Sequence, residues 1–202
     1  MPPEAKLAGP ADVAAMTTSL CAAFADDPVF EYISPNLTPA ERIPRLKGFF
    51  KVETQQKVKK ATAWTTADGA AGALWAAPDQ WRTSFGETLR LAIPMLTGAR
   101  GRIRQAAGLL QHVEKHHPTE PHWYLAVLGT HPDHQGQGIG AALLQPVLER
   151  CDREVVPAYL ESSKESNVPY YERFGFRVTR ELKAAPDAPT LYAMWREPQL
   201  DG

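Results

Sequence analysis

A glycine-rich stretch lies between two segments of different character. It runs from His131 to Gly140 with the sequence HPDHQGQGIG, after the apolar run WYLAVLGT and before the helix-like run AALLQPVLER. Glycine lets a backbone approach another group closely, and the first turn of a helix presents free N–H groups at the positive end of its dipole. A strand, a glycine-rich loop and a helix in this order therefore predict an anion-binding site.

Two patterns with different ligands fit the stretch. Gly136, Gly138 and Ala141 match GxGxxA, the fingerprint of dinucleotide-binding folds, which would make the protein an oxidoreductase. That fingerprint normally lies in the first βα unit, and too little chain follows it here for the further units. A P-loop is excluded because no Lys-Ser or Lys-Thr pair ends the stretch. The other pattern is Gln135, two residues, Gly138, one residue and Gly140.

Through this second pattern the sequence resembles the GNAT superfamily of N-acetyltransferases. The resemblance implies an α/β (α+β) fold of one domain, in which helices flank a mixed central sheet whose middle strands splay apart. It also implies acetyl-CoA as co-substrate, with the loop N–H groups and the following helix holding its pyrophosphate. The coenzyme-binding residues implied in this way are Leu128, Gly129, Thr130, Gln135, Gly136, Gln137, Gly138, Ile139, Gly140, Ala141 and Asn167.

A second motif, NVPYYERFGF, follows in the chain. Asn167 is a favourable N-cap, Pro169 suits a first helical turn and Gly175 suits a helix end, so a helix of barely two turns is expected. In GNAT enzymes a tyrosine at the position of Tyr171 lies beside the coenzyme sulfur. Tyr171 is therefore the expected proton donor to the departing thiolate, with packing of its ring in the core as the alternative.

Acetyl transfer to an amine also needs a polarised carbonyl and a base. By resemblance, the N–H groups of Leu128, Gly129 and Thr130 would polarise the thioester, unless they pair with a neighbouring strand. Glu161 is the expected base, because it ends the strand beside the one that leads into the glycine-rich loop. The alternative for Glu161 is a solvated surface carboxylate.

Four longer stretches resemble the puromycin N-acetyltransferases in particular. They are AFADDP, EPHWYLAVLGTHPDHQGQGIG, PAYLESS and NVPYYERFGFRVT. This resemblance implies a small-molecule amine, such as an aminonucleoside antibiotic, as the acceptor. The expected acceptor pocket consists of Phe24, Asp27, Phe30 and Tyr32, although these residues suit the packing and capping of the first helices equally well.

Composition narrows the function classes further. The chain has 202 residues, 44% of them hydrophobic, which suits one domain over 1–202, and its formal net charge of −1 predicts no nucleic-acid partner. The resemblance implies a coenzyme-binding core at about 120–178 of this domain. No apolar run is long enough to cross a membrane, and the start does not resemble a signal peptide, so a cytoplasmic location is expected. Cys21 and Cys151 lack the spacing of a zinc site or disulfide framework, and the histidines fit no metal motif.

Several functional alternatives stay open at this level. The protein could be a non-catalytic acyl-CoA sensor or interaction module, or it could acetylate a peptide or protein. A monomer and a homodimer are both alternatives, because the last strand could pair within the chain or across two copies.

Periodicity and turn residues predict the elements that would position these groups. Helices are expected from Pro10 to before Asp27, over 39–59, over much of 81–115, over 138–151 and over 169–174. Strands are expected at 6–8, in a hairpin around Asp68 and Gly69, and at 123–130, 155–162, 176–182 and 190–196.

Overall fold

One mixed sheet forms the centre of the protein. The structure is a computed structural model that describes residues 4–81 and 102–199. Its seven strands have the order β1-β2-β3-β4-β5-β7-β6. They are β1 (Lys6–Leu7), β2 (Ala63–Thr65), β3 (Ala71–Ala76), β4 (Trp123–Thr130), β5 (Ala158–Ser162), β6 (Arg177–Leu182) and β7 (Leu191–Arg196). Among the strands of the described residues, only β4 and β5 pair in parallel, so the predicted mixed sheet is confirmed.

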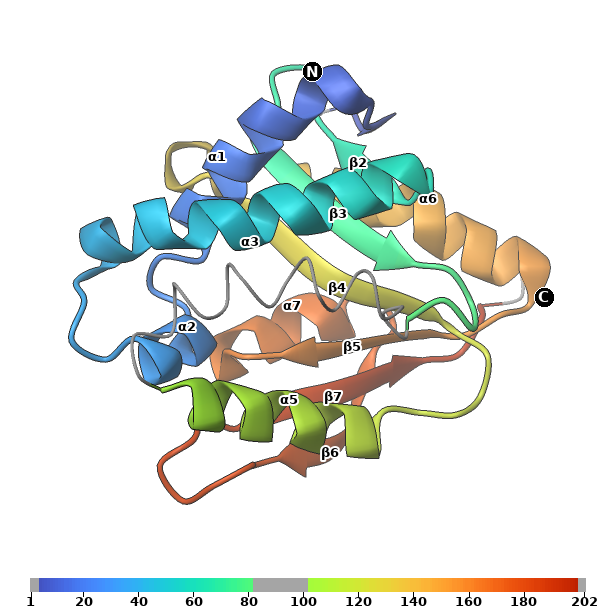
Figure 1. The fold of residues 1–202 in the computed structure, drawn as a ribbon. Helices are drawn as coiled ribbons and strands as arrows, with labels where there is room; N and C mark the ends of the chain where they lie inside the picture. The colour runs from blue at the N-terminus through green and yellow to red at the C-terminus, as the bar shows by residue number, and fades with distance from the viewer. Residues whose placement is uncertain (1–3, 82–101, 200–202) are drawn as a thin grey trace.

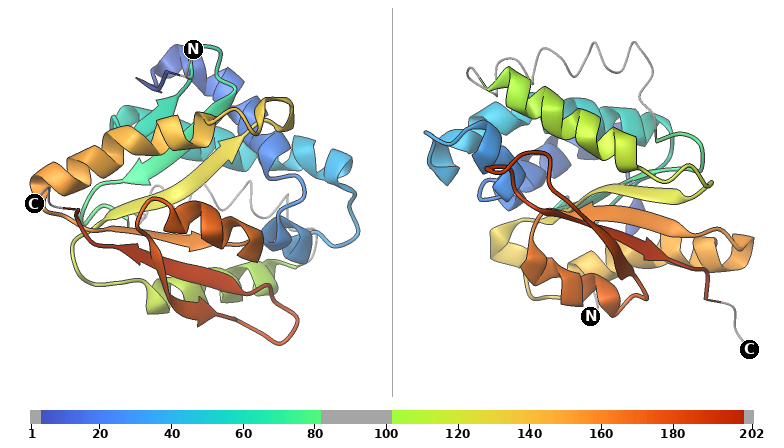
Figure 2. Two further views of the ribbon diagram at one scale, coloured as in Figure 1. Left: turned by 180° about the vertical axis from the view of Figure 1, so that it is seen from behind. Right: turned by 90° about the horizontal axis from the view of Figure 1, so that it is seen from below.

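Helices cover both faces of this sheet (Figures 1 and 2). The helices on one face are α1 (Val13–Ala23), α2 (Pro28–Ile33), α3 (Pro39–Lys59) and α5 (Ile103–His116), and those on the other are α6 (Ile139–Glu154) and α7 (Val168–Glu172). The core is divided accordingly. Leu143 and Leu144 of α6 pack against Trp75 and Leu160 on one face, whereas Leu109 of α5 belongs to a cluster with Tyr159 on the other.

The parallel strands β4 and β5 separate near their middle. They pair only from Trp123 to Leu125 of β4 and from Ala158 to Leu160 of β5. At this point β4 has a bulge, because Leu74 of β3 faces Val127 while the next residue, Trp75, faces Leu125, which leaves Ala126 unpaired. A bulge bends a strand and increases its twist. Beyond it β4 continues along β3 alone, so the predicted splay of the middle strands is confirmed (Figure 1).

Most predicted elements are present, with two corrections. The helix α2 was not predicted, and β5 begins at Ala158 rather than Val155. Val155 adopts a left-handed φ of 55° and ends α6, so the chain turns there instead of extending. The predicted helix over much of 81–115 is seen as α5, while its part from 82 to 101 lies outside the described residues.

Two further predictions concern the last strand of the chain and membrane-spanning helices. The last strand, β7, pairs with both β5 and β6 of the same chain. Within residues 4–81 and 102–199, no helix combines the length and the apolar character needed to cross a membrane.

Candidate functional site

The glycine-rich loop leads from the end of β4 to the start of α6. Gly136 and Gly138 have φ angles of +76° and +78°, a left-handed conformation that strains other residues, and a Cβ added to either would meet no heavy atom within 4 Å. The loop backbone therefore faces open space. Gln135 holds the loop to the strand, since its Nε2 donates a hydrogen bond of 3.2 Å to the carbonyl oxygen of Thr130.

Other residues of the predicted coenzyme site serve different purposes. A Cβ on Gly140 would lie 2.7 Å from the Tyr170 hydroxyl, so this glycine lets α7 approach α6. Ile139 is buried in the core below α6, whereas Gln137 is exposed. Asn167 is at the N-cap position of α7, as predicted, but its side chain makes no capping hydrogen bond and is exposed.

The end of β4 presents N–H groups to the gap between β4 and β5. The N–H of His131 donates to the carbonyl oxygen of Ala70, which continues from β3. Because N–H directions alternate along a strand, the N–H of Gly129 also points toward β3, and those of Leu128 and Thr130 point toward the gap. Of the three predicted residues, these two are placed to polarise a carbonyl there.

Gly129 has a packing role in addition. A Cβ at this position would lie 2.9 Å from the Phe24 ring and 3.0 Å from Ala23 Cβ, so only glycine lets α1 pack this closely on β4. Sequence reasoning offered a role at the coenzyme or pairing with a neighbouring strand for this residue, and the structure pairs it with Gly72 of β3.

Tyr171 lies on the α6 face of the sheet. It is 8% exposed, and its ring packs against Phe176 with centroids 6.1 Å apart. Burial raises the pKa of Tyr171, and Tyr170 and the charge of Asp27 raise it further. The phenol therefore stays protonated at neutral pH, as a proton donor must.

Asp27 combines a capping role with a place near Tyr171. One carboxylate oxygen caps α2 by accepting a hydrogen bond of 2.9 Å from the N–H of Val29, and the other accepts one from the hydroxyl of Ser163, just beyond β5. The residue is 4% exposed, and burial raises its pKa against the effect of these hydrogen bonds. The sequence offered capping and pocket lining as alternatives, and the position of Asp27 is compatible with both.

Glu161 lies on the opposite face of β5 from the Leu160 side chain, which contacts the core around Tyr171. Its side chain is only 6% exposed, so it is not a solvated surface carboxylate. Its Oε1 lies 3.3 Å from Nδ1 of His117, although the two atoms are not aligned as a hydrogen bond. Burial raises the pKa of Tyr124 and Tyr159, and the charge of Glu161 raises both further.

The other predicted acceptor residues separate into two clusters. Phe24 and Phe30 pack with Phe50 of α3, with ring centroids 5.2 and 5.7 Å from that ring. Tyr32 belongs instead to the cluster around Tyr159, with the Arg102 guanidinium 5.0 Å from its ring. Sequence reasoning missed His117 as a neighbour of Glu161, because no spacing signal links two residues so far apart in the chain.

Sequence comparisons relate the chain to acetyltransferases. Residues 103–187 match the family model described as an acetyltransferase (GNAT) domain. An N-acetyltransferase of Schizosaccharomyces pombe, described as uncharacterized, is 28% identical over 91% of this chain and 78% of the relative. The L-amino acid N-acyltransferase MnaT of Escherichia coli is 32% identical over 68 residues, which are 32% of this chain and 38% of the relative.

Solved structures share the fold over almost the whole chain. A Corynebacterium glutamicum structure, described as histone acetyltransferase HPA2 and related acetyltransferase, has a TM-score of 0.69 and 23% identity, covering 100% of this chain and 99% of that one. Arylalkylamine N-acetyltransferase 2 of Aedes aegypti has a TM-score of 0.66 and 13% identity, with 97% and 99% covered. These likenesses concern the arrangement of the sheet and helices described above.

Proposed function

Since the protein is an acyltransferase that carries a GNAT acetyltransferase domain, we propose that it transfers the acetyl group of acetyl-CoA to the primary amine of a small molecule. The observation that carries the proposal is the gap between β4 and β5. One side of this gap presents the N–H groups of Leu128 and Thr130, and its end opens on the left-handed glycines Gly136 and Gly138.

These features fit acetyl-CoA. The open space over Gly136 and Gly138 leaves the loop N–H groups and the start of α6 accessible to a pyrophosphate, which binds there without a lysine. When bound, the coenzyme supplies an activated thioester. The N–H groups of Leu128 and Thr130 would stabilise negative charge on its carbonyl oxygen as the amine attacks.

Two ionisable side chains complete the reaction. Glu161 takes a proton from the attacking amine, and Tyr171 donates a proton to the departing thiolate. The two residues lie on opposite faces of the sheet, so transfer would take place through the gap between β4 and β5. The amine attacks the thioester directly. Neither Cys21 nor Cys151 would serve as a nucleophile for a covalent intermediate, because both are buried in the core away from this gap.

The charge of the site favours a cationic amine as acceptor. Glu161 is almost fully buried, and Asp27 is a second buried carboxylate near Tyr171. Buried carboxylates are stabilised by a positively charged partner, which a protonated small amine supplies. An antibiotic-like amine such as puromycin is one member of this class. Peptide acetylation and coenzyme sensing without catalysis are the alternatives.

Calorimetric titration with acetyl-CoA tests the coenzyme site. We expect micromolar binding that Gly138→Val weakens at least about tenfold, because a β-branched residue at a φ of +78° distorts the loop. Gly108→Ala is the matched control, since a Cβ there meets nothing within 4 Å and the position lies on α5. Absence of acetyl-CoA binding by the unmodified protein would contradict the proposal.

An amine panel tests the acceptor. Release of free coenzyme thiol is measured with puromycin, arylalkylamines, diamines, amino acids and short peptides with free N-termini. Turnover of the small amines supports the proposal. Turnover of the peptides alone would assign a peptide acetyltransferase, and binding of acetyl-CoA without turnover of any amine would assign a sensor.

A further inference from the structure

Two polar contacts join the turn between α1 and α2 to the turn that follows β5. The hydroxyl of Ser163 donates a hydrogen bond to Oδ2 of Asp27. Beside it, Nζ of Lys164 donates one of 2.9 Å to Oδ1 of Asp26. Adjacent residues of one turn thus contact adjacent residues of the other, although the partners lie 136 and 138 positions apart in the chain. We call this pair of contacts the clasp.

The clasp crosses the wide end of the gap between β4 and β5. These parallel strands stop pairing after Leu125 and Leu160, so the gap widens toward their carboxyl ends. The end of α1 lies on the end of β4, because a Cβ on Gly129 would lie 3.0 Å from the Cβ of Ala23. Ser163 directly follows β5. The chain from α1 to α2 therefore passes from the end of one strand to the end of the other (Figures 1 and 2).

The clasp lies next to the two side chains that would react. Glu161 precedes Ser163 by two residues, and its side chain is on the face of the sheet that α1 and α2 cover. Burial raises the pKa of Tyr171, and the charge of Asp27 contributes to that rise, so the Asp27 carboxylate is near the phenol as well. An amine between Glu161 and Tyr171 would therefore lie beside the clasp.

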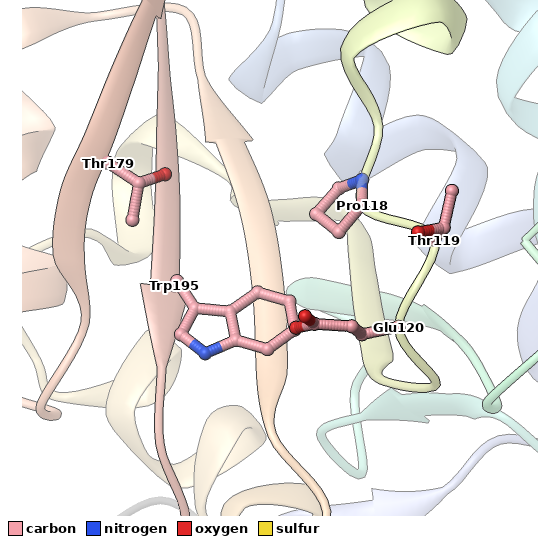
Figure 3. Close-up of a pocket in the computed structure, with 5 residues that line it drawn as sticks. All are labelled: Pro118, Thr119, Glu120, Thr179 and Trp195. Carbon is pink, nitrogen blue, oxygen red and sulfur yellow. The ribbon is translucent and has the colours of Figure 1, made fainter.

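Buried rings separate Glu161 from the open hollow on the same face of the sheet. This hollow of about 380 Å³, shown in Figure 3, is lined by Pro118, Thr119, Glu120, Thr179 and Trp195. The ring of His122 lies 5.6 Å from that of Trp195, between centroids, and its Nε2 lies 3.0 Å from Nε2 of His117. Nδ1 of His117 in turn lies 3.3 Å from Glu161. An acceptor would therefore approach Glu161 along the gap, past the clasp, rather than from the hollow.

The two contacts of the clasp support each other. Asp27 is 4% exposed and also caps α2, so its hydrogen bond from Ser163 is charge-assisted and shielded from water. The side chains of Asp26 and Lys164 are 67% and 30% exposed, and such an ion pair contributes little to stability by itself. Placed side by side, the two contacts fix both the separation and the orientation of the turns.

This separation is too small for a polypeptide chain to pass between the turns. Extended chains that lie side by side are about 4.7–4.9 Å apart, so a chain that ran between the two turns would hold them roughly 9–10 Å apart. The Ser163 hydroxyl and the Asp27 carboxylate are instead in direct contact. A compact amine does not need to run between the turns, because its whole body fits on one side of them.

We propose that the clasp selects acceptors by size, since it admits small primary amines to Glu161 and keeps polypeptide chains out of the wide end of the gap. The inference rests on the proposed function, in which Glu161 takes a proton from the amine. Asp26, Asp27, Ser163 and Lys164 contact one another and not the reacting atoms, so they act on specificity as positioning residues.

Kinetics of an opened clasp test the selection. Asp26→Ala combined with Ser163→Ala removes one partner from each contact and leaves the Asp27 cap of α2 in place. We compare kcat/KM for the best small amine of the panel with kcat/KM for tetra-alanine, a peptide with a free N-terminus. The ratio of small amine to peptide should fall at least about tenfold, while the KM for acetyl-CoA stays within about twofold of the wild-type value. A general loss of stability would lower both values of kcat/KM alike and leave their ratio unchanged.

Lys6→Gln is the matched control. It removes the charge from another exposed ion pair, in which Lys6 Nζ lies 2.8 Å from Asp12 at the β1 edge of the sheet. The wild-type ratio should be kept. A ratio within about twofold of the wild-type value in the double variant, or an equal change in Lys6→Gln, would overturn the proposal. Wild-type turnover of tetra-alanine as fast as that of the small amine would overturn it as well.

Hydrogen–deuterium exchange supplies a readout that does not depend on turnover. In the double variant, exchange should rise together over 24–30 and 163–168, because each turn holds the other in place. A rise confined to one of the two turns would overturn the clasp. Failure of the wild-type protein to acetylate any amine would contradict the proposed function, and the selection with it, while exchange would still show whether the two turns open together.

Discussion

Replacing Tyr171 by phenylalanine removes one hydroxyl group and leaves the ring packed against Phe176. Because burial and the neighbouring groups raise the pKa of Tyr171 above its usual value of 10, the hydroxyl is protonated throughout the range of an ordinary assay. A positioned general acid contributes about 10²- to 10⁴-fold to a rate. At about 1.36 kcal/mol per factor of ten, this is roughly 2.7–5.5 kcal/mol of transition-state stabilisation.

We therefore expect Tyr171→Phe to lower kcat by roughly 100-fold or more, while the Kd for acetyl-CoA changes by less than about twofold. Release of the coenzyme thiol measures kcat, and calorimetry measures the Kd. The stability of the fold should change little, because the buried ring is retained.

Tyr170→Phe is the matched control on the same helix. Its hydroxyl is buried and has no hydrogen-bond partner among the described residues, so its loss should leave kcat within about threefold and should not destabilise the protein. Equal rates for the two variants, or a wild-type rate for Tyr171→Phe, would refute the assignment of Tyr171 as the acid.

Two further predictions concern stability and are checked by chemical denaturation. Gly129→Ala should destabilise the fold by about 1–3 kcal/mol, because its Cβ would make short contacts under α1. Gly108→Ala should instead stabilise α5 by about 0.5–1 kcal/mol. A Gly129→Ala variant with the stability of the wild-type protein would contradict the packing argument. Asp152→Asn should cost about 2 kcal/mol, less than for a fully buried pair, because Asp152 is 26% exposed and its partner Arg196 is 3% exposed. Hydrogen bonds from Arg196 lower the pKa of Asp152, so this stabilisation is present at neutral pH and is lost as the pH falls through the lowered pKa. The variant should lose this part of the acid dependence of stability. If the variant keeps the wild-type acid dependence, that dependence comes from other groups.

Local signals in the sequence were sufficient for several elements. The start of α3 follows from Pro39 and from the capping box of Thr38 and Glu41. The bounds of β4 follow from an alternating pattern that the structure shows as alternating burial. The start of β5 was misplaced, because the left-handed turn at Val155 breaks an apolar run that has no glycine or proline at that residue.

The glycine-rich loop, the strand before it, the helix after it and the short helix that carries Tyr171 were determined by the sequence itself, since each depends on residues close together in the chain. Only the tertiary structure decided that Ala126 forms a bulge where β4 and β5 separate, and that Tyr171 and Glu161 lie on opposite faces of the sheet. It also decided that His117 lies beside Glu161, 44 positions further along the chain. Such contacts depend on strand pairing and burial, and these are set by the packing of the whole core rather than by any local pattern of residues.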